Sequence, residues 1–557
     1  MSETVLECLA QSLRQSAAHD GNATVPPAAV IWPDEDSQWA PIIPELAKHC
    51  RILTLGPYDA STYTGPALWL RCAVAGTLDE VPGFVDGPPV MYLPGISRAA
   101  LKSASASNPG LAPLVPLQYR SQLFSQANGR DWTIRAFLTN EERGLGLSVA
   151  ADEVTAAALC SGIRELVCEP VQRLAGRFID AAFVNDLLNP DPVRLLLDWL
   201  NDPSAIEESL DPAKWAAFSS QCKVDYGFDP EALGVIEAAR RLADGQGAWR
   251  NVWSRLRETP TDYPGIITRL QDAQPPELVP ANPGAWPDVN SAAEDALRAA
   301  LLELGSSSAE EARNRVIALE REHKARRGYV WADLGDAPLA LALEHLALVA
   351  EQAGMPAPNG DVAAIGQWYS NAGWQVDLAA IRAIGEAKSE RDSSAVSAVL
   401  DAIYQPWLRL GAESLQSAIG SAVNSGTYVV PPAPSPNAGE VIVFVDGLRM
   451  DVARVLSRSL TDDGAEVDLT LDLAPLPTVT PSAKPARVPV SATLLGAGGG
   501  LDACRASSGA SAGVEVLRSL LREADIEVLT PLEIGTPDGR GWTEAGEFDR
   551  RGHELGA

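Results

Sequence analysis

The sequence predicts a multidomain protein with an α/β region at each end and an all-helical region between them. Short apolar, β-rich runs alternate with helical patterns at both ends of the chain. This alternation favours mainly parallel sheets covered by helices. The middle carries apolar side chains at helical spacing, interrupted by Pro and Gly, which is typical of packed helices. We divide the 557 residues into an N-terminal α/β domain (1–175), a helical domain (176–432) and a partial α/β domain (433–557).

The strands of the N-terminal domain are predicted from apolar runs that end near turn residues such as Pro33-Asp34 and Gly56-Pro57. No GxxxxGK[ST] or GxGxxG sequence follows any of these runs, so we interpret the region as an α/β module without a phosphate-binding loop. The five predicted strands are 28–32, 51–55, 67–72, 90–93 and 132–138.

A Pro-rich linker, VPPAPSPNA at 430–438, separates the helical region from the last domain. Three further strands are predicted at 440–445, 465–473 and 525–529. The GAGGG sequence at 496–500 has no Lys-Ser or Lys-Thr after it, which favours a hinge or turn over a phosphate-binding loop.

Composition excludes several classes of protein. The formal net charge of -29 opposes nonspecific binding of phosphate backbones, so we expect any contact with nucleic acid to be made through partners. The seven cysteines are scattered without a CxxC pair, which is typical of reduced thiols rather than of disulfides or a zinc ribbon. No apolar run is long enough to span a membrane, and the N-terminus lacks the features of a signal peptide. We therefore expect a cytoplasmic protein with no membrane contact.

The strongest chemical motif is EVIVFVDGLRMDVARVL at 440–456. An apolar strand leads directly into Asp446-Gly447, and a helix follows. Ligands of open α/β sheets bind at the carboxyl ends of strands, where a carboxylate can hold a metal ion. Gly447 permits the tight turn that this placement requires. A turn-forming Asp without a ligand is the alternative.

Two weaker motifs follow. In PLPTVTPSAKPA at 475–486, Thr478 and Thr480 lie in a loop restricted by prolines, and a metal ion can convert such a hydroxyl into a nucleophile. Near the end of the sequence, Asp549 and His553 are four residues apart, so a helix would place both on one face, where they could bind one cation. Common loop chemistry and surface side chains are the alternatives.

The order of these motifs resembles the alkaline phosphatase superfamily: Asp-Gly-Leu-Arg after a buried strand, then Pro-Thr-x-Thr-Pro, then Asp-x-x-x-His. Within that superfamily the match resembles the PglZ domain. Segments such as AAVIWPDEDSQW (28–39), VMYLPGISR (90–98) and QCKVDYGFDPE (221–231) extend the resemblance, over essentially the whole chain, to the type B PglZ family of BREX phage-defence systems.

The resemblance implies a phosphohydrolase or phosphodiesterase that uses two divalent metal ions. Asp446 would bind one metal, and Thr480 would bind the same metal and act as the nucleophile. Asp549 and His553 would bind the other metal. Mixed His and Asp ligands suit zinc best, with manganese as the alternative. The implied partners are other BREX subunits, including the methyltransferase.

The sequence also departs from the family pattern, which requires a later Asp-His pair and a last histidine. Of the histidines at 19, 49, 323, 345 and 553, only His553 falls in the phosphatase-like region. We therefore expect half of a two-metal site, from a fragment, a split gene or a truncated gene. An incomplete sheet would expose an edge and apolar surface, so we expect 440–557 to be poorly stable. A non-catalytic interaction scaffold of the BREX complex is the alternative function.

Other charged residues permit two interpretations each. The basic run in REHKARRG, from His323 to Arg327, predicts either a solvated helix face or a contact with phosphate or nucleic acid. Arg449 and Lys484 flank the predicted site and would either touch a phosphate or have exposed or salt-bridged roles. We expect Asp451 to be an acid in the first turn of a helix, where it favours the helix dipole, and His345 to be packed within a helix.

Overall fold

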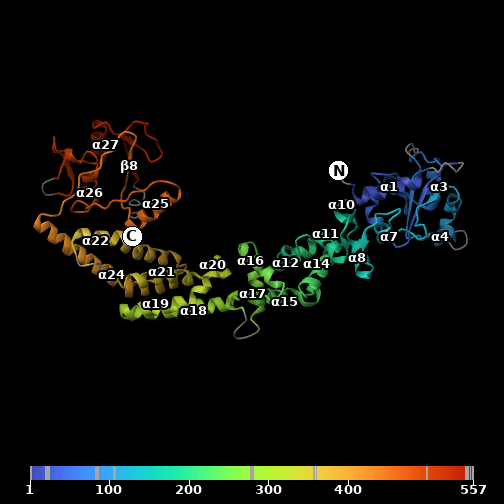
Figure 1. Cartoon of the computed structure of the whole chain (residues 1–557), viewed down its shortest axis with the longest axis horizontal. Helices are drawn as coiled ribbons and strands as arrows, with labels where there is room; N and C mark the ends of the chain where they lie inside the picture. The colour runs from blue at the N-terminus through green and yellow to red at the C-terminus, as the bar shows by residue number, and fades with distance from the viewer. Residues whose placement is uncertain are drawn as a thin grey trace. The chain divides into compact units, whose positions relative to one another are not determined.

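The computed structural model describes residues 3–18, 25–81, 87–103, 108–275, 282–355, 358, 360–496, 500–545, 551 and 554. The fold is mixed α/β and about 59% helical. The chain divides into two compact units, Met1–Pro287 and Asp288–Ala557, which are described separately below with the element labels of Figure 1. No helix of the described residues is long and apolar enough to cross a membrane.

The first unit begins with a five-stranded parallel sheet, as the alternating pattern predicts. Its spatial order is β3-β2-β4-β1-β5. Val30 of β1 pairs with Val90 of β4, and both strands continue in register. The strands are β1 (Val30–Asp34), β2 (Ile52–Leu55), β3 (Thr64–Gly65), β4 (Val90–Pro94) and β5 (Gln122–Leu123).

Two of the predicted N-terminal strands are wrong. The run at 67–72 is part of helix α3 (Ala67–Val74), and the run at 132–138 contains helix α7 (Ile134–Thr139). Thr133 starts α7 because its hydroxyl accepts a hydrogen bond from the backbone N–H of Ala136 at 3.1 Å. A short apolar run has no periodicity that separates a buried strand from one or two helical turns.

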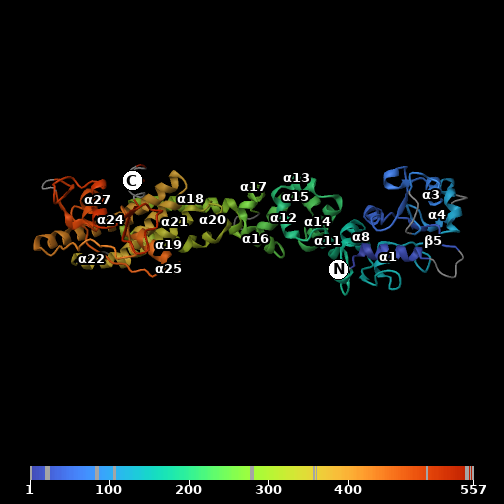
Figure 2. The ribbon, with the colours of Figure 1, turned by 90° about the horizontal axis from the view of Figure 1, so that it is seen from above.

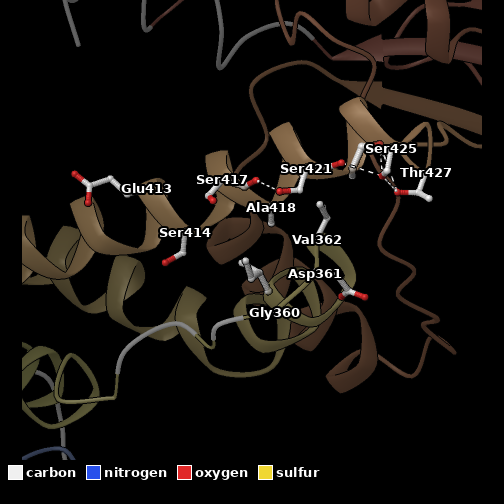
Figure 3. Close-up of a pocket in the computed structure, with 12 residues that line it drawn as sticks. Gly360, Asp361, Val362, Glu413, Ser414, Ser417, Ala418, Ser421, Ser425 and Thr427 are labelled. Atoms are coloured by element: carbon white, nitrogen blue, oxygen red, sulfur yellow. Dashed lines mark hydrogen bonds between the residues drawn. The ribbon is translucent and has the colours of Figure 1, made fainter.

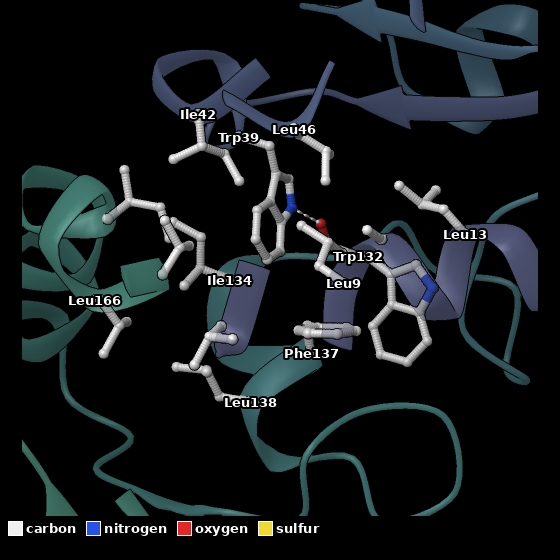
Figure 4. Packing of buried hydrophobic residues seen from close by; sticks show 14 of the residues in the cluster. Leu9, Leu13, Trp39, Ile42, Leu46, Trp132, Ile134, Phe137, Leu138 and Leu166 are labelled. Carbon is white, nitrogen blue, oxygen red and sulfur yellow. Dashed lines mark hydrogen bonds between the residues drawn. The ribbon is translucent and has the colours of Figure 1, made fainter. Parts of the chain in front are cut away.

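Helices cover both faces of this sheet and form one hydrophobic core on each face. Alternate residues of β1 and β4 point into one core or the other. Val30, Trp32 and Tyr92 face a core that includes helix α1 (Val5–Ala17) and α7. Ile31 and Met91 face the second core, which includes α3. Figure 4 shows the first core, in which the indole N–H of Trp39 donates to the carbonyl of Trp132 at 2.7 Å.

The carboxylate at the end of β1 is bound internally. Asp34 is buried and accepts hydrogen bonds from the Tyr92 hydroxyl at 2.6 Å and from the backbone N–H groups of Gln38 and Trp39. Burial raises the pKa of Asp34, and these three donors oppose the shift. Asp34 therefore ties β1 to β4 and to the turn that follows β1.

The rest of the first unit is helical, apart from the parallel pair β6 (Ser148–Val149) and β7 (Phe178–Ile179). Four helices begin with Asp-Pro, at Asp191, Asp202, Asp211 and Asp229, whose side chains cap backbone N–H groups while proline occupies the first helical position. The helices are α8 (Glu153–Ser161), α9 (Ile163–Cys168), α10 (Val171–Leu174), α11 (Ala181–Leu188), α12 (Pro192–Asn201), α13 (Pro203–Ser209), α14 (Pro212–Asp225), α15 (Pro230–Asp244), α16 (Trp249–Glu258) and α17 (Pro264–Ala273).

The second unit begins with a helical bundle. Helices α19, α21 and α24 lie side by side in Figures 1 and 2, and their apolar faces form one core with α23. A π-helical turn, Tyr369–Gly373, joins α22 to α23. The helices are α18 (Pro287–Glu303), α19 (Ala309–His323), α20 (Val330–Asp333), α21 (Pro338–Gln352), α22 (Val362–Trp368), α23 (Trp374–Glu386) and α24 (Glu390–Ser425).

An α/β segment follows the bundle in the same unit. Its parallel sheet has the order β11-β12-β8, and an antiparallel pair is formed by β9 and β10. The elements are β8 (Val441–Val445), α25 (Met450–Asp462), α26 (Thr480–Arg487), β9 (Leu494–Gly496), β10 (Ala503–Arg505), α27 (Val514–Glu523), β11 (Glu527–Leu529) and β12 (Gly541–Ala545).

Two of the three strands predicted here are confirmed, as β8 and β11. The third, 465–473, is wrong because this segment has no regular structure. The carbonyl of Ala474, the residue after this segment, accepts a hydrogen bond at 2.7 Å from the hydroxyl of Tyr428, which lies between α24 and β8. Strand β12 was not predicted. Of the GAGGG sequence, 497–499 lie outside the described residues, and Gly496 ends β9.

The α/β segment exposes much apolar surface. One face of its sheet packs Trp542 against Phe444 and helix α27. On the opposite face of β8, Val441 and Val443 are 45% and 57% exposed. Nearly half of the exposed large apolar side chains among the described residues fall between 441 and 545, which is less than a fifth of the chain. Parallel sheets are usually covered on both faces, so β8 is an atypical edge strand.

The hydrogen bonds of Asp34 predict that Tyr92→Phe destabilises the N-terminal sheet. Losing one donor to a buried carboxylate should cost about 1–3 kcal/mol. Native-state hydrogen exchange of the amides in β1 and β4 measures this local free energy. Tyr119→Phe is the matched control because Tyr119 is 88% exposed, and it should change the value by less than about 0.5 kcal/mol. Equal protection in the two variants would contradict a structural role for the Asp34–Tyr92 hydrogen bond.

The exposed apolar surface predicts that proteolysis starts in the C-terminal α/β segment. Thermolysin, which cleaves beside apolar residues, should cut between 441 and 545 before it cuts the N-terminal sheet, because local opening is easiest where few apolar contacts are buried. Mass spectrometry of the first fragments identifies the sites. Equal resistance of the two regions would refute this ranking of their stabilities.

Candidate functional site

The predicted metal ligand Asp446 lies directly after β8. The strand ends at Val445, Gly447 adopts a left-handed conformation with a φ of 74°, and helix α25 begins at Met450. This is the predicted order of strand, tight turn and helix. The Asp446 side chain is half-buried, and the described residues provide it with no hydrogen-bond or ion-pair partner. Its carboxylate is therefore available to bind a ligand at the carboxyl end of the strand.

The predicted nucleophile Thr480 is the first residue of α26, and it is exposed. Thr478 lies two residues earlier and is also exposed. No described side chain or backbone group forms a hydrogen bond with either hydroxyl. Both hydroxyls are accessible, and their burial and contacts do not favour one over the other.

Lys484 brings the Thr480 segment to the sheet. Its ammonium group lies 2.8 Å from a carboxylate oxygen of Glu544 on β12 and 5.5 Å from the centre of the Phe444 ring on β8. Glu544 and Phe444 are paired in register, one residue before the carboxyl ends of their strands. Because Thr480 precedes Lys484 by about one helical turn, Thr480 and Asp446 belong to segments that meet at the same end of the sheet.

The structure places only part of the predicted metal site. Asp549 and His553 lie outside the described residues. The described residues contain no group of three or more His, Cys, Asp or Glu side chains that could hold a metal ion. Asp446 and Thr480 offer a carboxylate and a hydroxyl oxygen, which suit a divalent cation. Structural and catalytic zinc sites take three or four protein ligands, so these two oxygens alone would not complete such a site.

The two cations that flank the predicted site form salt bridges. Lys484 pairs with Glu544, as described above. Arg449 lies 3.2 Å from Asp451 and 3.8 Å from Asp377 of helix α23. Burial lowers the pKa of Arg449, but its hydrogen bond to Asp451 and the charges of both aspartates outweigh burial and raise the pKa overall. Of the two interpretations of these cations, the structure supports salt bridges.

Asp451 is in the first turn of α25, as predicted, but it is also fully buried. One of its oxygens accepts hydrogen bonds from the Arg449 side chain and from the backbone N–H of Val452, at 3.2 and 3.0 Å. The other oxygen is buried and has no partner among the described residues. Sequence analysis did not single out Asp377, because nothing in its local sequence indicates a partner more than seventy residues away.

Two tyrosines complete this cluster. The hydroxyls of Tyr369 and Tyr404 both donate to the Asp377 carboxylate, and the distance from Tyr404 is 2.7 Å. Burial, together with these hydrogen bonds to Asp377, raises the pKa of both phenols. The phenols therefore stay protonated and act as donors.

Within the basic run from His323 to Arg327, His323 and Arg326 are buried, Arg327 is half-buried and Lys324 is exposed, so the predicted solvated face is wrong for all but Lys324 among the charged residues. Arg326 is buried and lies 2.8 Å from Glu294. Arg327 pairs with Glu320 at 2.6 Å. His323 is buried, and burial followed by the charge of Arg326 lowers its pKa. The partner of Arg326 comes from α18 and that of Arg327 from the preceding turns of α19. His345 is half-buried within α21, as predicted, and burial lowers its pKa.

A groove of about 680 Å³ lies elsewhere in the second unit, between the start of α22 and the second half of α24 (Figure 3). Ser414, Ser417 and Ser421 line it from successive turns of α24, and Asp361 lines it from the residue that precedes α22. Asp361 accepts a hydrogen bond from the backbone N–H of Ala364 and so caps α22. The groove contains none of the predicted site residues.

Comparisons of the chain with protein-family models, with curated proteins and with solved structures found no match.

Proposed function

We propose that this chain is a metal-dependent phosphohydrolase or phosphodiesterase component of a BREX phage-defence system, and that it contributes part of a two-metal site. The motif order in the sequence suggests the function. The observation that supports it is that the side chains of Asp446 and Thr480 have no hydrogen-bond partner among the described residues. Lys484 holds the segments that carry them together at one end of the β8–β12 sheet. Metal and substrate sites of α/β proteins lie at such strand ends.

In the proposed reaction, Thr480 is the nucleophile. Its oxygen attacks phosphorus and displaces the alcohol leaving group, which forms a phosphothreonine. Water then cleaves the new P–O bond, and this step releases phosphate or a phosphomonoester and restores the hydroxyl. Zinc or manganese ions would lower the pKa of the attacking group and neutralise the phosphoryl oxygens. Asp446 would contribute a carboxylate to the ion next to Thr480, and Asp549 and His553 would bind the second ion.

The proposal predicts that Thr480→Ala abolishes hydrolysis of bis(p-nitrophenyl) phosphate in the presence of zinc or manganese. Removal of a covalent nucleophile should lower kcat by about a hundredfold or more. Thr478→Ala is the matched control, because Thr478 is a neighbouring exposed threonine that should leave the rate unchanged. The protein should be purified from its native gene, and a chelator should remove the activity. Undiminished hydrolysis by Thr480→Ala would exclude Thr480 as the nucleophile.

A second candidate function is a non-catalytic scaffold of the BREX complex in the cytoplasm. The exposed apolar side chains of the C-terminal α/β segment favour it, because apolar patches on a surface are typical of protein interfaces. The proposed partners are other BREX subunits, including the methyltransferase, and nucleic acid would be reached through them.

The scaffold function predicts stable co-purification with the BREX methyltransferase that Asp446→Ala leaves unchanged. The Asp446 carboxylate is a proposed metal ligand at a strand end, so its loss should not alter an apolar interface. Size-exclusion chromatography of the co-expressed proteins provides the measurement. If neither the wild type nor the variant forms a complex with any BREX subunit, the scaffold function is wrong.

A further inference from the structure

A buried polar cluster joins the predicted site to the helical bundle. It consists of Tyr369, Asp377 and Tyr404 from the bundle and of Arg449 and Asp451 from the start of α25. Asp377 is 5% exposed and Asp451 is 0% exposed. Two carboxylates thus lie in the interior of the second unit, and both contact the same guanidinium group.

The geometry makes Arg449 the link between the two segments. Its Nε lies 3.2 Å from Asp451, two residues later, and its Nη2 lies 3.8 Å from Asp377 on α23. Each oxygen of the Asp377 carboxylate also accepts a hydrogen bond from a tyrosine hydroxyl, one from Tyr369 and the other from Tyr404. Arg454, one turn further along α25, donates to the carbonyl of Ser370 in the π-helical turn. The start of α25 is therefore fixed to the bundle at two places.

The energetics make this link difficult to replace. A buried carboxylate without a cation is costly, and removing one partner of a buried pair is strongly destabilising. Because Arg449 is half exposed, with 52% of its side chain accessible, its own pairing contributes less than that of a fully buried pair. One oxygen of Asp451 is buried without a hydrogen-bond partner among the described residues, so the positive charge of Arg449 is especially important for stabilising this carboxylate.

We propose that Arg449 is a positioning residue for Asp446. The guanidinium lies three residues after Asp446, in the turn between β8 and α25, and it fixes that turn by bridging Asp451 and Asp377. Because the turn is fixed to the bundle, the Asp446 carboxylate keeps one position at the end of β8. This inference rests on the proposed function, because the proposed function requires the fixed Asp446 carboxylate to bind a metal ion.

The first test measures hydrogen exchange of the amides from 446 to 449 in the full chain. Arg449→Gln should raise their exchange rate about tenfold or more, while Arg449→Lys should give a smaller increase, because an ammonium keeps the charge but lacks the planar fork. Arg458→Gln is the matched control, since Arg458 is an exposed residue of the same helix. Wild-type exchange in Arg449→Gln would overturn the proposal.

The second test separates positioning from general stability. With bis(p-nitrophenyl) phosphate, Arg449→Gln should raise the manganese concentration for half-maximal rate about tenfold and leave the KM for substrate unchanged, with partial recovery in Arg449→Lys. A lower rate with an unchanged metal requirement would overturn the positioning role. If Arg449→Gln does not fold, Tyr404→Phe removes one donor to Asp377 and should shift the exchange rate and the metal requirement in the same direction by less.

The two tests distinguish this inference from the proposed function. If the wild-type protein shows slow hydrogen exchange of the amides from 446 to 449 but never hydrolyses the substrate, the proposed function is refuted. The comparison of hydrogen-exchange rates between the wild type and Arg449→Gln would then decide by itself whether Arg449 fixes the turn.

Discussion

Buried carboxylates and their partners connect the elements of this acidic chain. The sequence has 73 acidic and 44 basic residues, and several acids in the interior are paired or hydrogen-bonded to residues far along the chain. Asp34 binds Tyr92 across the N-terminal sheet. Glu294 binds Arg326 and also caps α21 through the backbone N–H groups of Leu339 and Ala340. Because a buried charge is tolerated only with such partners, these bonds restrict how the helices can pack.

The same constraint organises the second unit. Arg298 of α18 lies 2.8 Å from Asp392, which also forms a capping box with Ser389 at the start of α24. Asp377 and Asp451 share Arg449, which connects the bundle to the turn after β8. The C-terminal α/β segment has a small core of its own and a partly exposed sheet. Arg449 and Arg454 of this segment both bond to the bundle, at Asp377 and at the carbonyl of Ser370.

This arrangement bears on both proposed functions. An enzyme site at the end of β8 requires a fixed carboxylate, and the polar cluster holds the turn that carries Asp446. A scaffold requires exposed apolar surface, which the same segment provides on β8 and on neighbouring loops. The two functions use different parts of one segment, so they are compatible in a protein that contributes part of a catalytic site to a larger assembly.

The parallel character of the N-terminal sheet, the helical middle and the strand–turn–helix that carries Asp446 could all be predicted from the sequence. These features follow from local patterns: apolar runs of strand length, helical spacing and glycine at a turn. The sequence also indicated that the C-terminal sheet would expose apolar surface. Local pattern failed at 67–72 and 132–138, where short apolar runs form helices, because their length permits either structure.

Only the tertiary structure decided which charges act together. Arg326 and Arg449 resemble surface cations in the sequence, but folding places them beside Glu294, Asp377 and Asp451. Strand β12 also depends on tertiary contacts, because its Trp542 packs against Phe444 of a strand nearly a hundred residues earlier. The physical reason is that electrostatic pairing and sheet register depend on distances in space between residues remote in sequence. Local spacing therefore places Asp446 at the end of a strand, and the packing of distant helices decides how firmly it is held there.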